Sequence, residues 1–451
     1  MKPNRTHGTI AVIGGGPAGM MAAIQAAMSG ADVELYERND RVGKKLLSTG
    51  NGKCNFSNTR MTKDAYYGSG VSFYHDLYDQ FGVSETIDFF SQSGMLIKDR
   101  QGYLYPLSNQ ASTVLDVMRF ALERYGITVH TDCMVEALHA DRQTNRIQVT
   151  ATGSRLPKQT RKYYDALILA CGGMAAPKTG SDGNGYTLAK SLGHHITEIV
   201  PALVQLHCEE DYLKSVAGVR IEAALTLRID EKVRSRVQGE LQLTDYGISG
   251  IPVFQFSREA AYALLHKKKV SVGIDFLPGY EEEAYSRLWK ERFRTMEDQT
   301  LIQFLTGISN KKINQLMIRL CGCREQDHVK DLPASARRQI AALYRNLTLH
   351  ISKTNGFEQA QVCAGGIPAG ELTARLESKY VPHLFMAGEI IDMDGICGGY
   401  NLQWAFTSGA IAGRAAAESI RADGKQPDGE SKVSQLPVKN IDKRRSDDQN
   451  Q

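Results

Sequence analysis

The chain has 451 residues, of which 42% are hydrophobic and 23% are charged, a composition typical of a soluble globular protein with two or three domains. Its formal net charge of +4 is too small for the concentrated basic surface expected of a nucleic-acid-binding protein. No apolar run approaches the roughly 20 residues that cross a membrane. We therefore expect a cytoplasmic protein that acts on a small molecule, with neither a nucleic acid nor a membrane as partner.

The first 37 residues predict a strand, a glycine-rich turn, a helix and a second strand in direct succession. Residues 9–13 form a β-branched run, the sequence GGGPAG occupies 14–19, and residues 20–28 are rich in Ala and Met. Residues 31–36 alternate like a strand and lead directly to Glu37. This order of elements is typical of a dinucleotide-binding fingerprint.

Each part of the fingerprint has a mechanical role. Gly14 permits the sharp turn from strand to helix, Gly16 allows the backbone to approach a pyrophosphate, and Gly19 allows the helix to pack close to the strand. The helix N-terminus adds free N–H groups and a positive dipole end for the phosphates. Glu37, at the end of the second strand, is expected to accept hydrogen bonds from a ribose.

Residues 41–55 form a second glycine-rich segment without regular periodicity. Such a segment suits a chain laid along a long cofactor, with Lys44 or Lys45 neutralising phosphate charge. A flexible surface loop is the alternative. Cys54 lies in this segment, and we favour close packing over a redox role because none of the eight cysteines belongs to a CxxC pair. The scattered cysteines also predict neither a disulfide framework nor a metal site.

The middle of the chain mixes element types. Helices with a hairpin at 95–106 are predicted up to residue 125, followed by strands at 127–135, 147–150 and 164–170 and a helix at 186–192. Gly173, just after the last strand, is a second position where the backbone can approach a cofactor.

The composition changes after Pro201. Alternating apolar and polar residues at 219–229, with similar runs at 240–244 and 270–276, predict a small antiparallel barrel or sandwich over residues 201–277. Residues 281–351 carry apolar residues at helical spacing and are predicted to be helical. Residues after 422 are polar and are predicted to be disordered.

Near the end of the chain, the sequence again predicts a strand, a glycine-rich segment and a helix in succession. Residues 381–389 predict a strand with a sharp end at Gly388, a glycine-rich segment follows, and a helix is predicted from residue 401 to about residue 419. The N-terminus of that helix is expected to stabilise negative charge on a reduced flavin ring. Glu389 and Asp394 are candidates for binding a ribityl hydroxyl.

Residues 48–58 and 387–409 resemble the BaiN/YhiN-type family of FAD-binding flavoproteins, which includes a bile-acid reductase and aminoacetone oxidase. The sequence AGEIIDMDGICGGYNLQWAFTSG is the most specific part of a likeness that runs from about residue 10 to residue 415. Residues 179–194 are more distantly similar to the fumarate reductase and ketosteroid dehydrogenase superfamily. We therefore expect an α/β fold: a discontinuous Rossmann-like FAD-binding domain with an inserted antiparallel β-barrel and a helical subdomain.

The expected divisions are 1–198 and 351–422 for the two parts of the FAD-binding domain, 199–278 for the barrel, 279–350 for the helical subdomain and 423–451 for a disordered tail. The resemblance implies that FAD contacts are spread over much of the chain. They fall at Gly14, Gly16, Pro17, Ala18, Gly19, Glu37, Arg38, Lys45, Thr49, Gly50, Asn51, Cys54, Asn55, Val135, Gly173, Glu389, Asn401 and Leu402, to which the residue patterns add Gly388 and Asp394.

The chain departs from the family at residues 244–252. The family often has a Thr-His pair before a glycine-rich turn, and here Asp245 stands where His is common. Asp245 and Tyr246 are candidate polar groups of a substrate site. The alternative is a structural turn that starts a helix.

A bound flavin supports several reactions, and the sequence assigns no catalytic acid or base. The lack of a second GxGxxG unit disfavours a pyridine-nucleotide disulfide reductase but allows NAD(P)H to visit as a transient electron donor. We favour an NAD(P)H-dependent reductase of an activated C=C bond in a small organic molecule. The alternatives are a flavin amine oxidase of the aminoacetone oxidase type and, from another class, a tRNA-modifying or redox-sensing flavoprotein.

Overall fold

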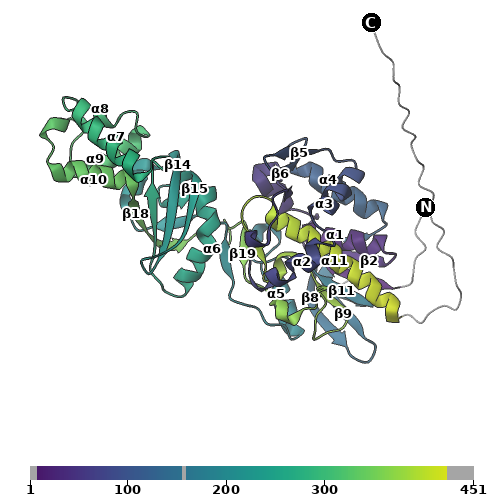
Figure 1. Ribbon diagram of the computed structural model, residues 1–451. Coiled ribbons are helices and arrows are strands. Elements are labelled where there is room, and N and C mark those ends of the chain that lie inside the picture. Colours follow the sequence, from purple (N-terminus) through teal and green to yellow (C-terminus); the bar gives the residue numbers. More distant parts are fainter. Residues whose placement is uncertain (1–7, 155–158, 424–451) are drawn as a thin grey trace, which may run out of the picture.

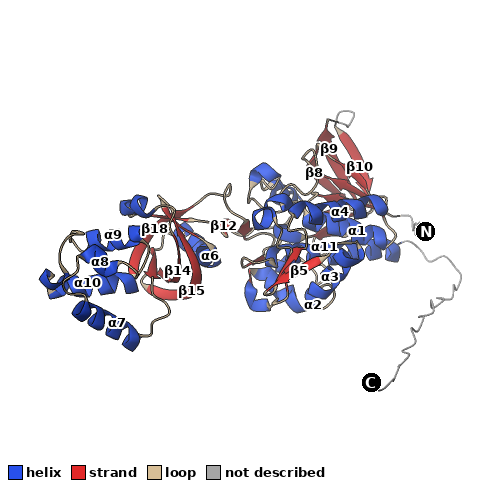
Figure 2. Cartoon of the chain, turned by 90° about the horizontal axis from the view of Figure 1, so that it is seen from above, coloured by secondary structure: helices blue, strands red, loops and turns tan. Residues whose placement is uncertain are grey.

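The computed structural model describes residues 8–154 and 159–423, which form three bodies in a row (Figure 1). The largest is a Rossmann domain built from both ends of the chain, a β-barrel adjoins it, and a helical unit lies beyond the barrel. Seen from above, a narrow connection around β12 (Val200–Ala202) joins the first two bodies (Figure 2). The predicted α/β architecture with an inserted barrel is confirmed. Except for residue 423, the predicted tail lies outside the described residues.

A parallel sheet forms the centre of the Rossmann domain. Its strand order is β20 (Leu384–Met386), β11 (Ala166–Leu169), β1 (Thr9–Ile13), β2 (Asp32–Tyr36) and β7 (Thr128–His130). Ile10, Ala11 and Val12 are fully buried, because such a sheet is covered on both faces.

The single strand predicted at 127–135 is wrong. β7 ends at His130, and β8 (Cys133–Asp141) belongs to a separate antiparallel sheet with β9 (Arg146–Gly153) and β10 (Thr160–Tyr164). Asp132 lies between the two strands with a φ of 52°, a left-handed conformation that turns the chain from one sheet to the other.

The helices α1 (Pro17–Met28) and α11 (Tyr400–Asp423) pack along each other in the same direction. Gly409 and Gly413 of α11 lie against the backbone of α1. A Cβ on Gly409 would lie 2.4 Å from the carbonyl oxygen of Ala18, and one on Gly413 would lie 2.3 Å from that of Ala22. The glycines therefore allow the close helix contact, which places the first turns of both helices at one end of the sheet.

The Rossmann domain also contains further helices and short strands. They are helices α2 (Tyr74–Tyr78), α3 (Val83–Gln92), α4 (Ala111–Arg124) and α5 (Asn184–Ser191), the predicted hairpin of β5 (Ile97–Arg100) and β6 (Tyr103–Pro106), β3 (Ser57–Asn58) beside β6, and the pair β4 (Tyr66–Tyr67) with β21 (Asp394–Gly395). β12 pairs with β19 (Val362–Ala364) where the barrel is attached.

The inserted body is a closed antiparallel barrel with a helical unit between its last two strands in the chain. Its strand order is β13 (Leu206–Cys208), β16 (Gly247–Ser249), β15 (Lys232–Leu243), β14 (Arg220–Ile229), β17 (Val270–Asp275) and β18 (Leu347–Thr354), with α6 (Ile251–Leu265) packed on it. The helical unit holds α7 (Glu282–Thr295), α8 (Leu301–Leu305), α9 (Lys311–Leu320) and α10 (Ala334–Arg345). None of the described helices has both the length and the hydropathy that crossing a membrane would need.

The prediction that residues 281–351 are wholly helical is wrong at its end. Leu347, Leu349 and Ile351 are buried and alternate with more exposed residues, which is the period of a strand. β18 therefore closes the barrel instead of extending the helical unit.

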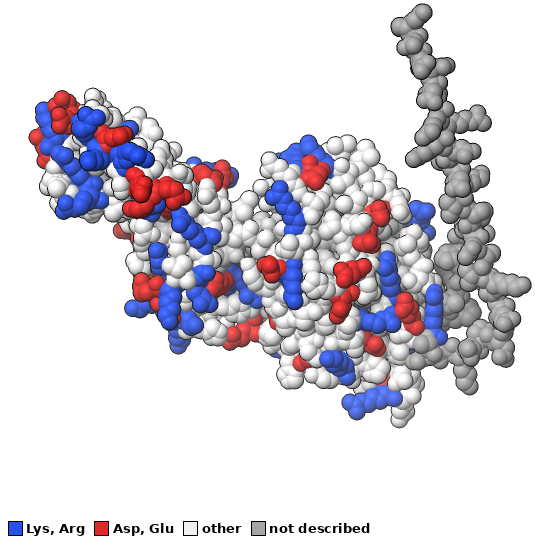
Figure 3. All heavy atoms as spheres, in the orientation of Figure 1, with Lys and Arg blue, Asp and Glu red and all other residues white. Residues whose placement is uncertain are grey.

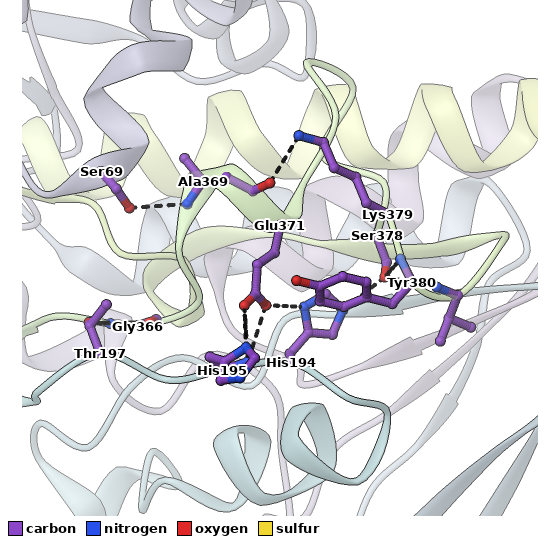
Figure 4. Close-up of polar contacts among 12 residues, drawn as sticks. Ser69, His194, His195, Thr197, Gly366, Ala369, Glu371, Ser378, Lys379 and Tyr380 are labelled. Atoms are coloured by element: carbon purple, nitrogen blue, oxygen red, sulfur yellow. Dashed lines mark hydrogen bonds and ion pairs between the residues drawn. The ribbon is translucent and has the colours of Figure 1, made fainter.

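A polar cluster fastens the segment that follows α5 (Figure 4). The Glu371 carboxylate contacts Nδ1 of His194 at 2.8 Å and Nδ1 of His195 at 2.7 Å, and it accepts a hydrogen bond from the backbone N–H of His195. The Ser378 hydroxyl lies 2.8 Å from Nε2 of His194, and burial lowers the pKa of that histidine. Because this segment leads into β12, the cluster anchors the connection to the barrel.

Candidate active site

A cavity of about 890 Å³ lies at the carboxyl ends of the parallel strands. Gly14 after β1, Glu37 after β2, Ala170 after β11 and Ala387 after β20 all line it. This edge is where open α/β sheets bind their ligands, and the volume falls within the usual range for cofactor sites.

The glycines of the turn before α1 have different surroundings, and those of Gly14 and Gly19 fit the turn and packing roles predicted for them. Gly14 has a φ of 108°, and a Cβ there would lie 2.5 Å from the carbonyl oxygen of Ala170. A Cβ on Gly19 would lie 1.9 Å from the carbonyl oxygen of Gly14, so Gly19 serves packing and does not line the cavity. A Cβ on Gly16 would meet no atom within 4 Å, so this backbone borders open space beside the helix N-terminus.

Glu37 is buried at the cavity edge and already holds the surrounding backbone. One carboxylate oxygen accepts from the N–H of Gly15 at 2.9 Å, and the other accepts from the backbone and side-chain nitrogens of Asn39 at 2.8 and 2.7 Å. Burial raises its pKa, and these hydrogen bonds oppose the rise. Each carboxylate oxygen has more than one lone pair, so the predicted ribose contact is compatible with this arrangement.

Three of the positive side chains that line the cavity are paired with carboxylates. Lys45 Nζ lies 2.9 Å from Oε2 of Glu389, Lys44 Nζ lies 2.7 Å from an oxygen of Asp40, and Arg38 pairs with Asp182. The expectation that Lys44 or Lys45 neutralises phosphate charge is therefore weakened, because each ammonium group already has a counter-charge. At the glycine-rich turn, the N-terminus of α1 contributes a positive potential.

The segment 41–55 follows the cavity as predicted, and its kinks need unusual backbone conformations. Gly50, Asn51 and Cys54 have φ values of 55°, 53° and 56°. Cys54 is fully buried and does not line the cavity, and burial raises the pKa of its thiol to about 12. This supports the packing interpretation of Cys54. Asn55 lines the cavity, and its buried Oδ1 has no hydrogen-bond partner among the described residues.

The first turn of α11 forms the other end of the cavity. The backbone around Asn401 and Leu402 lines it, but the Asn401 side chain is committed elsewhere: it accepts from the N–H of Gly395 at 2.8 Å and donates to that residue's carbonyl oxygen at 2.7 Å. Asp394 lies outside the lining, buried against Arg258, so its predicted ribityl contact is not supported. Glu389 remains the candidate because it lines the cavity.

The structure brings most of the predicted cofactor residues to this one cavity. Those that line it are Gly14, Gly16, Pro17, Ala18, Glu37, Arg38, Lys45, Thr49, Gly50, Asn51, Asn55, Val135, Glu389, Asn401 and Leu402. Those that do not are Gly19, Cys54, Gly173, Gly388 and Asp394. Gly173 and Gly388 instead allow close packing. A Cβ on Gly173 would lie 2.1 Å from the Cys363 sulfur, and one on Gly388 would lie 2.7 Å from the Cβ of Ala18.

Sequence reasoning missed the part of the cavity that the insertion contributes. Leu203, Ile251 and Phe254 line it, and no local motif marks them. Asp245 is exposed and Tyr246 stacks on His207 with a ring-centroid distance of 4.3 Å, and neither lines the cavity. Asp245 and Tyr246 instead precede the short strand β16, after which Gly250 turns the chain into α6, so the alternative interpretation, a structural segment that starts a helix, is supported for these two residues.

These features fit FAD. Gly16 borders space that a pyrophosphate can fill, and the first turn of α1 offers N–H groups and a positive dipole to its charge. Glu37, in the cavity lining, would supply an acceptor for a ribose hydroxyl. The unsatisfied Oδ1 of Asn55 calls for a donor that the described residues do not supply.

The chain is similar to known proteins over most of its length. Residues 8–415 match the family described as HI0933-like protein Rossmann domain. The chain is 41% identical over 412 residues to the 3-dehydro-bile acid delta(4,6)-reductase of Clostridium scindens, covering 91% of this chain and 99% of that protein. It is 25% identical over 402 residues to the ribosomal RNA dihydrouridine synthase of Escherichia coli, covering 88% and 95%. A solved 3-ketosteroid-delta4-(5alpha)-dehydrogenase from Rhodococcus jostii aligns with a TM-score of 0.46 and 15% identity over 94% of this chain and 98% of that chain.

Proposed function

From the chain's membership of the HI0933-like FAD-binding Rossmann family, which makes it an FAD-dependent oxidoreductase, we propose that it uses NAD(P)H to reduce an activated C=C bond in a small organic molecule. The observation that carries the proposal is the 41% identity, over nearly the whole of both chains, to a reductase of a 3-dehydro bile acid. The cavity supports it, because the apolar Leu203, Ile251 and Phe254 line the same space as the cofactor residues.

In this proposal, one C=C bond gains a hydride and a proton while NAD(P)H becomes NAD(P)⁺. Bound FAD supplies the two-electron chemistry between donor and acceptor. The first turn of α1 would hold the pyrophosphate, and the first turn of α11 would contact the flavin ring, since residues of both turns line the cavity. The described residues contain one parallel sheet with one fingerprint turn, so we propose that NAD(P)H binds transiently in the same cavity and leaves before the substrate enters.

Anaerobic stopped-flow spectroscopy tests this function. The holoprotein is mixed with NADH, NADPH or aminoacetone, and the bleaching of the flavin absorbance is followed. The reduced protein is then mixed with a steroid enone. We expect bleaching by NADH or NADPH and recovery of the oxidised spectrum by the enone. Bleaching by the amine alone would favour the amine oxidase alternative, and failure of the enone to reoxidise the flavin would contradict the proposal.

Reduction of a uracil base in RNA is the second candidate. It is favoured by the 25% identity to a ribosomal RNA dihydrouridine synthase, since dihydrouridine is uridine with a reduced C=C bond next to a carbonyl. On the face drawn in Figure 3, Lys and Arg side chains are interspersed with Asp and Glu, most densely over the helical unit, so that face offers no broad basic surface. Nucleoside analysis of ribosomal RNA incubated with reduced protein distinguishes the two: formation of dihydrouridine would favour RNA.

A further inference from the structure

The cavity continues past the cofactor residues and crosses the junction between the Rossmann domain and the insertion. Leu203 precedes β13, and Ile251 and Phe254 lie on the first turn of α6, yet all three line the same cavity as Asn401 and Leu402. The part of the cavity beside the start of α11 is therefore bounded by two domains.

The insertion contributes an apolar, well-fixed surface. Ile251 and Phe254 are three residues apart on α6 and so share one face of the helix. Ile251 is 56% exposed, although a large aliphatic side chain gains free energy when it is covered. Phe254 packs with Cys397 onto a small buried cluster at the junction. Gly250, with a φ of 106°, sets the direction in which the helix starts.

The Rossmann domain contributes aromatic rings. Tyr103 and Tyr105 alternate along β6, so both side chains lie on the same face of the strand, and both line the cavity. The Tyr103 ring lies over Gly398, where a Cβ would be 2.8 Å from it. Arg100 also lines the cavity, with its guanidinium 5.6 Å from the centroid of the Tyr105 ring. One of its guanidinium nitrogens donates to Oδ1 of Asn109 at 3.0 Å, which leaves its other N–H groups for a ligand.

We propose that Ile251, Phe254, Tyr103 and Tyr105 form a ring slot that binds a rigid, largely apolar, multi-ring carbonyl compound, and that Ile251 and Phe254 determine this preference. The proposal rests on the proposed function, because it places the reducible molecule beside the cofactor residues. Aromatic faces stack on flat rings, and the aliphatic and phenyl groups of α6 cover them. Arg100 is the one cation of the slot and suits a carbonyl or carboxylate at the edge of the ring system.

Equilibrium dialysis of the oxidised holoprotein against two ketones tests the slot independently of turnover. The probes are androstenedione, a multi-ring enone, and cyclohexenone, which keeps the reducible group on one ring. Wild-type protein is expected to bind androstenedione at least about tenfold more tightly than cyclohexenone, and Ile251→Gln to weaken androstenedione binding about tenfold. Phe254→Ala should act in the same direction. Cyclohexenone binding and FAD content should not change.

The matched control is Leu265→Gln. Leu265 lies on the same helix and is 49% exposed, but it does not line the cavity, so both ketones should bind as in wild type. Equal wild-type affinity for the two ketones, or equal effects of Ile251→Gln and Leu265→Gln, would overturn the slot even if the enzyme turns over. The expected binding pattern together with no reoxidation by either ketone would instead overturn the proposed reaction and leave the slot standing.

Discussion

Arg258 of α6 donates from Nε to Oδ1 of Asp394 over 2.9 Å, and this buried ion pair joins the insertion to the Rossmann domain. The guanidinium also lies 5.1 and 5.0 Å from the ring centroids of Tyr67 and Tyr262. Because α6 carries Ile251 and Phe254, the pair positions the residues that bound the far end of the cavity.

Arg258→Met should destabilise the protein substantially. It leaves the Asp394 carboxylate buried without a counter-charge, which costs about 3 kcal/mol of unfolding free energy. Arg234→Met is the matched control: Arg234 pairs with Glu259 of the same helix at 2.7 Å, but both side chains are exposed, so its loss should cost less than about 1 kcal/mol. Urea unfolding near neutral pH measures both. Similar losses in the two variants would show that the Arg258 pair contributes no more than a surface contact.

The free energy of unfolding should depend on pH through the titration of the Asp394 carboxyl group. Burial raises its pKa from 3.8 to about 6, although Arg258 opposes the rise. Between these pH values the folded protein keeps the proton that the unfolded chain has released. The stability that this group contributes is therefore fully present below about pH 4 and is lost as the pH rises to about 6.

At about 1.4 kcal/mol per pKa unit, the change amounts to about 3 kcal/mol. Asp394→Asn removes the titration. The unfolding free energy of wild type relative to this variant should fall by up to that amount between about pH 4 and pH 6 and stay level above about pH 7. Parallel pH profiles for the two proteins would contradict the prediction.

Glu37→Ala should weaken FAD binding about tenfold to a hundredfold, the loss of a charge-assisted hydrogen bond of roughly 1.5–3 kcal/mol. Its carboxylate also holds Gly15 and Asn39, so the loop before α1 loses support at the same time. Asp40→Ala is the control, since Asp40 is exposed and does not line the cavity. Titration of apoprotein with FAD measures both affinities. Equal affinities for the two variants would mean that Glu37 does not contact the cofactor.

Asn55→Ala should have opposite effects on the two forms of the protein. In the apoprotein it removes a buried acceptor that has no partner among the described residues, so the melting temperature should rise or stay the same. With FAD present it should weaken binding about fivefold to tenfold, the equivalent of one hydrogen bond. Asn58→Ala should lower the apoprotein melting temperature, because Asn58 donates to Gly398 at 3.0 Å and accepts from Arg60 at 2.9 Å. Destabilised Asn55→Ala apoprotein would contradict the assignment.

The midpoint potential of the bound flavin should depend on the backbone N–H groups at the N-terminus of α11. Asn401→Pro removes one backbone N–H in the first turn, where proline is tolerated, and it also removes the two side-chain hydrogen bonds to the backbone of Gly395. Asn401→Ala removes only those two hydrogen bonds. An N-terminal dipole contribution of up to ~2 kcal/mol corresponds to about 40 mV for two electrons, so the proline variant should have the lower potential of the two. Equal potentials with FAD fully bound would mean that this helix end does not face the flavin ring.

Local sequence patterns determined the elements that form the candidate cofactor site. The strand, turn, helix and strand that end at Glu37 need only short-range spacing of Gly14, Gly16 and Gly19, and the same holds for the glycine-rich entry to α11. Periodicity also separated the barrel from the helical unit, with two exceptions. The predicted barrel range 201–277 contains the helix α6, and residues 347–351, predicted as the end of a helix, belong to the strand β18.

Tertiary structure alone decided the pairing of charges and the composition of the far end of the cavity. Lys45 meets Glu389, Arg258 removes Asp394 from the cavity, and Ile251 reaches the cavity from an inserted domain. The two members of each pair lie more than a hundred residues apart in the chain. A sequence pattern reports the neighbours of a residue along the chain, whereas a buried charge or an apolar surface is satisfied by whichever group the fold brings within a few ångströms.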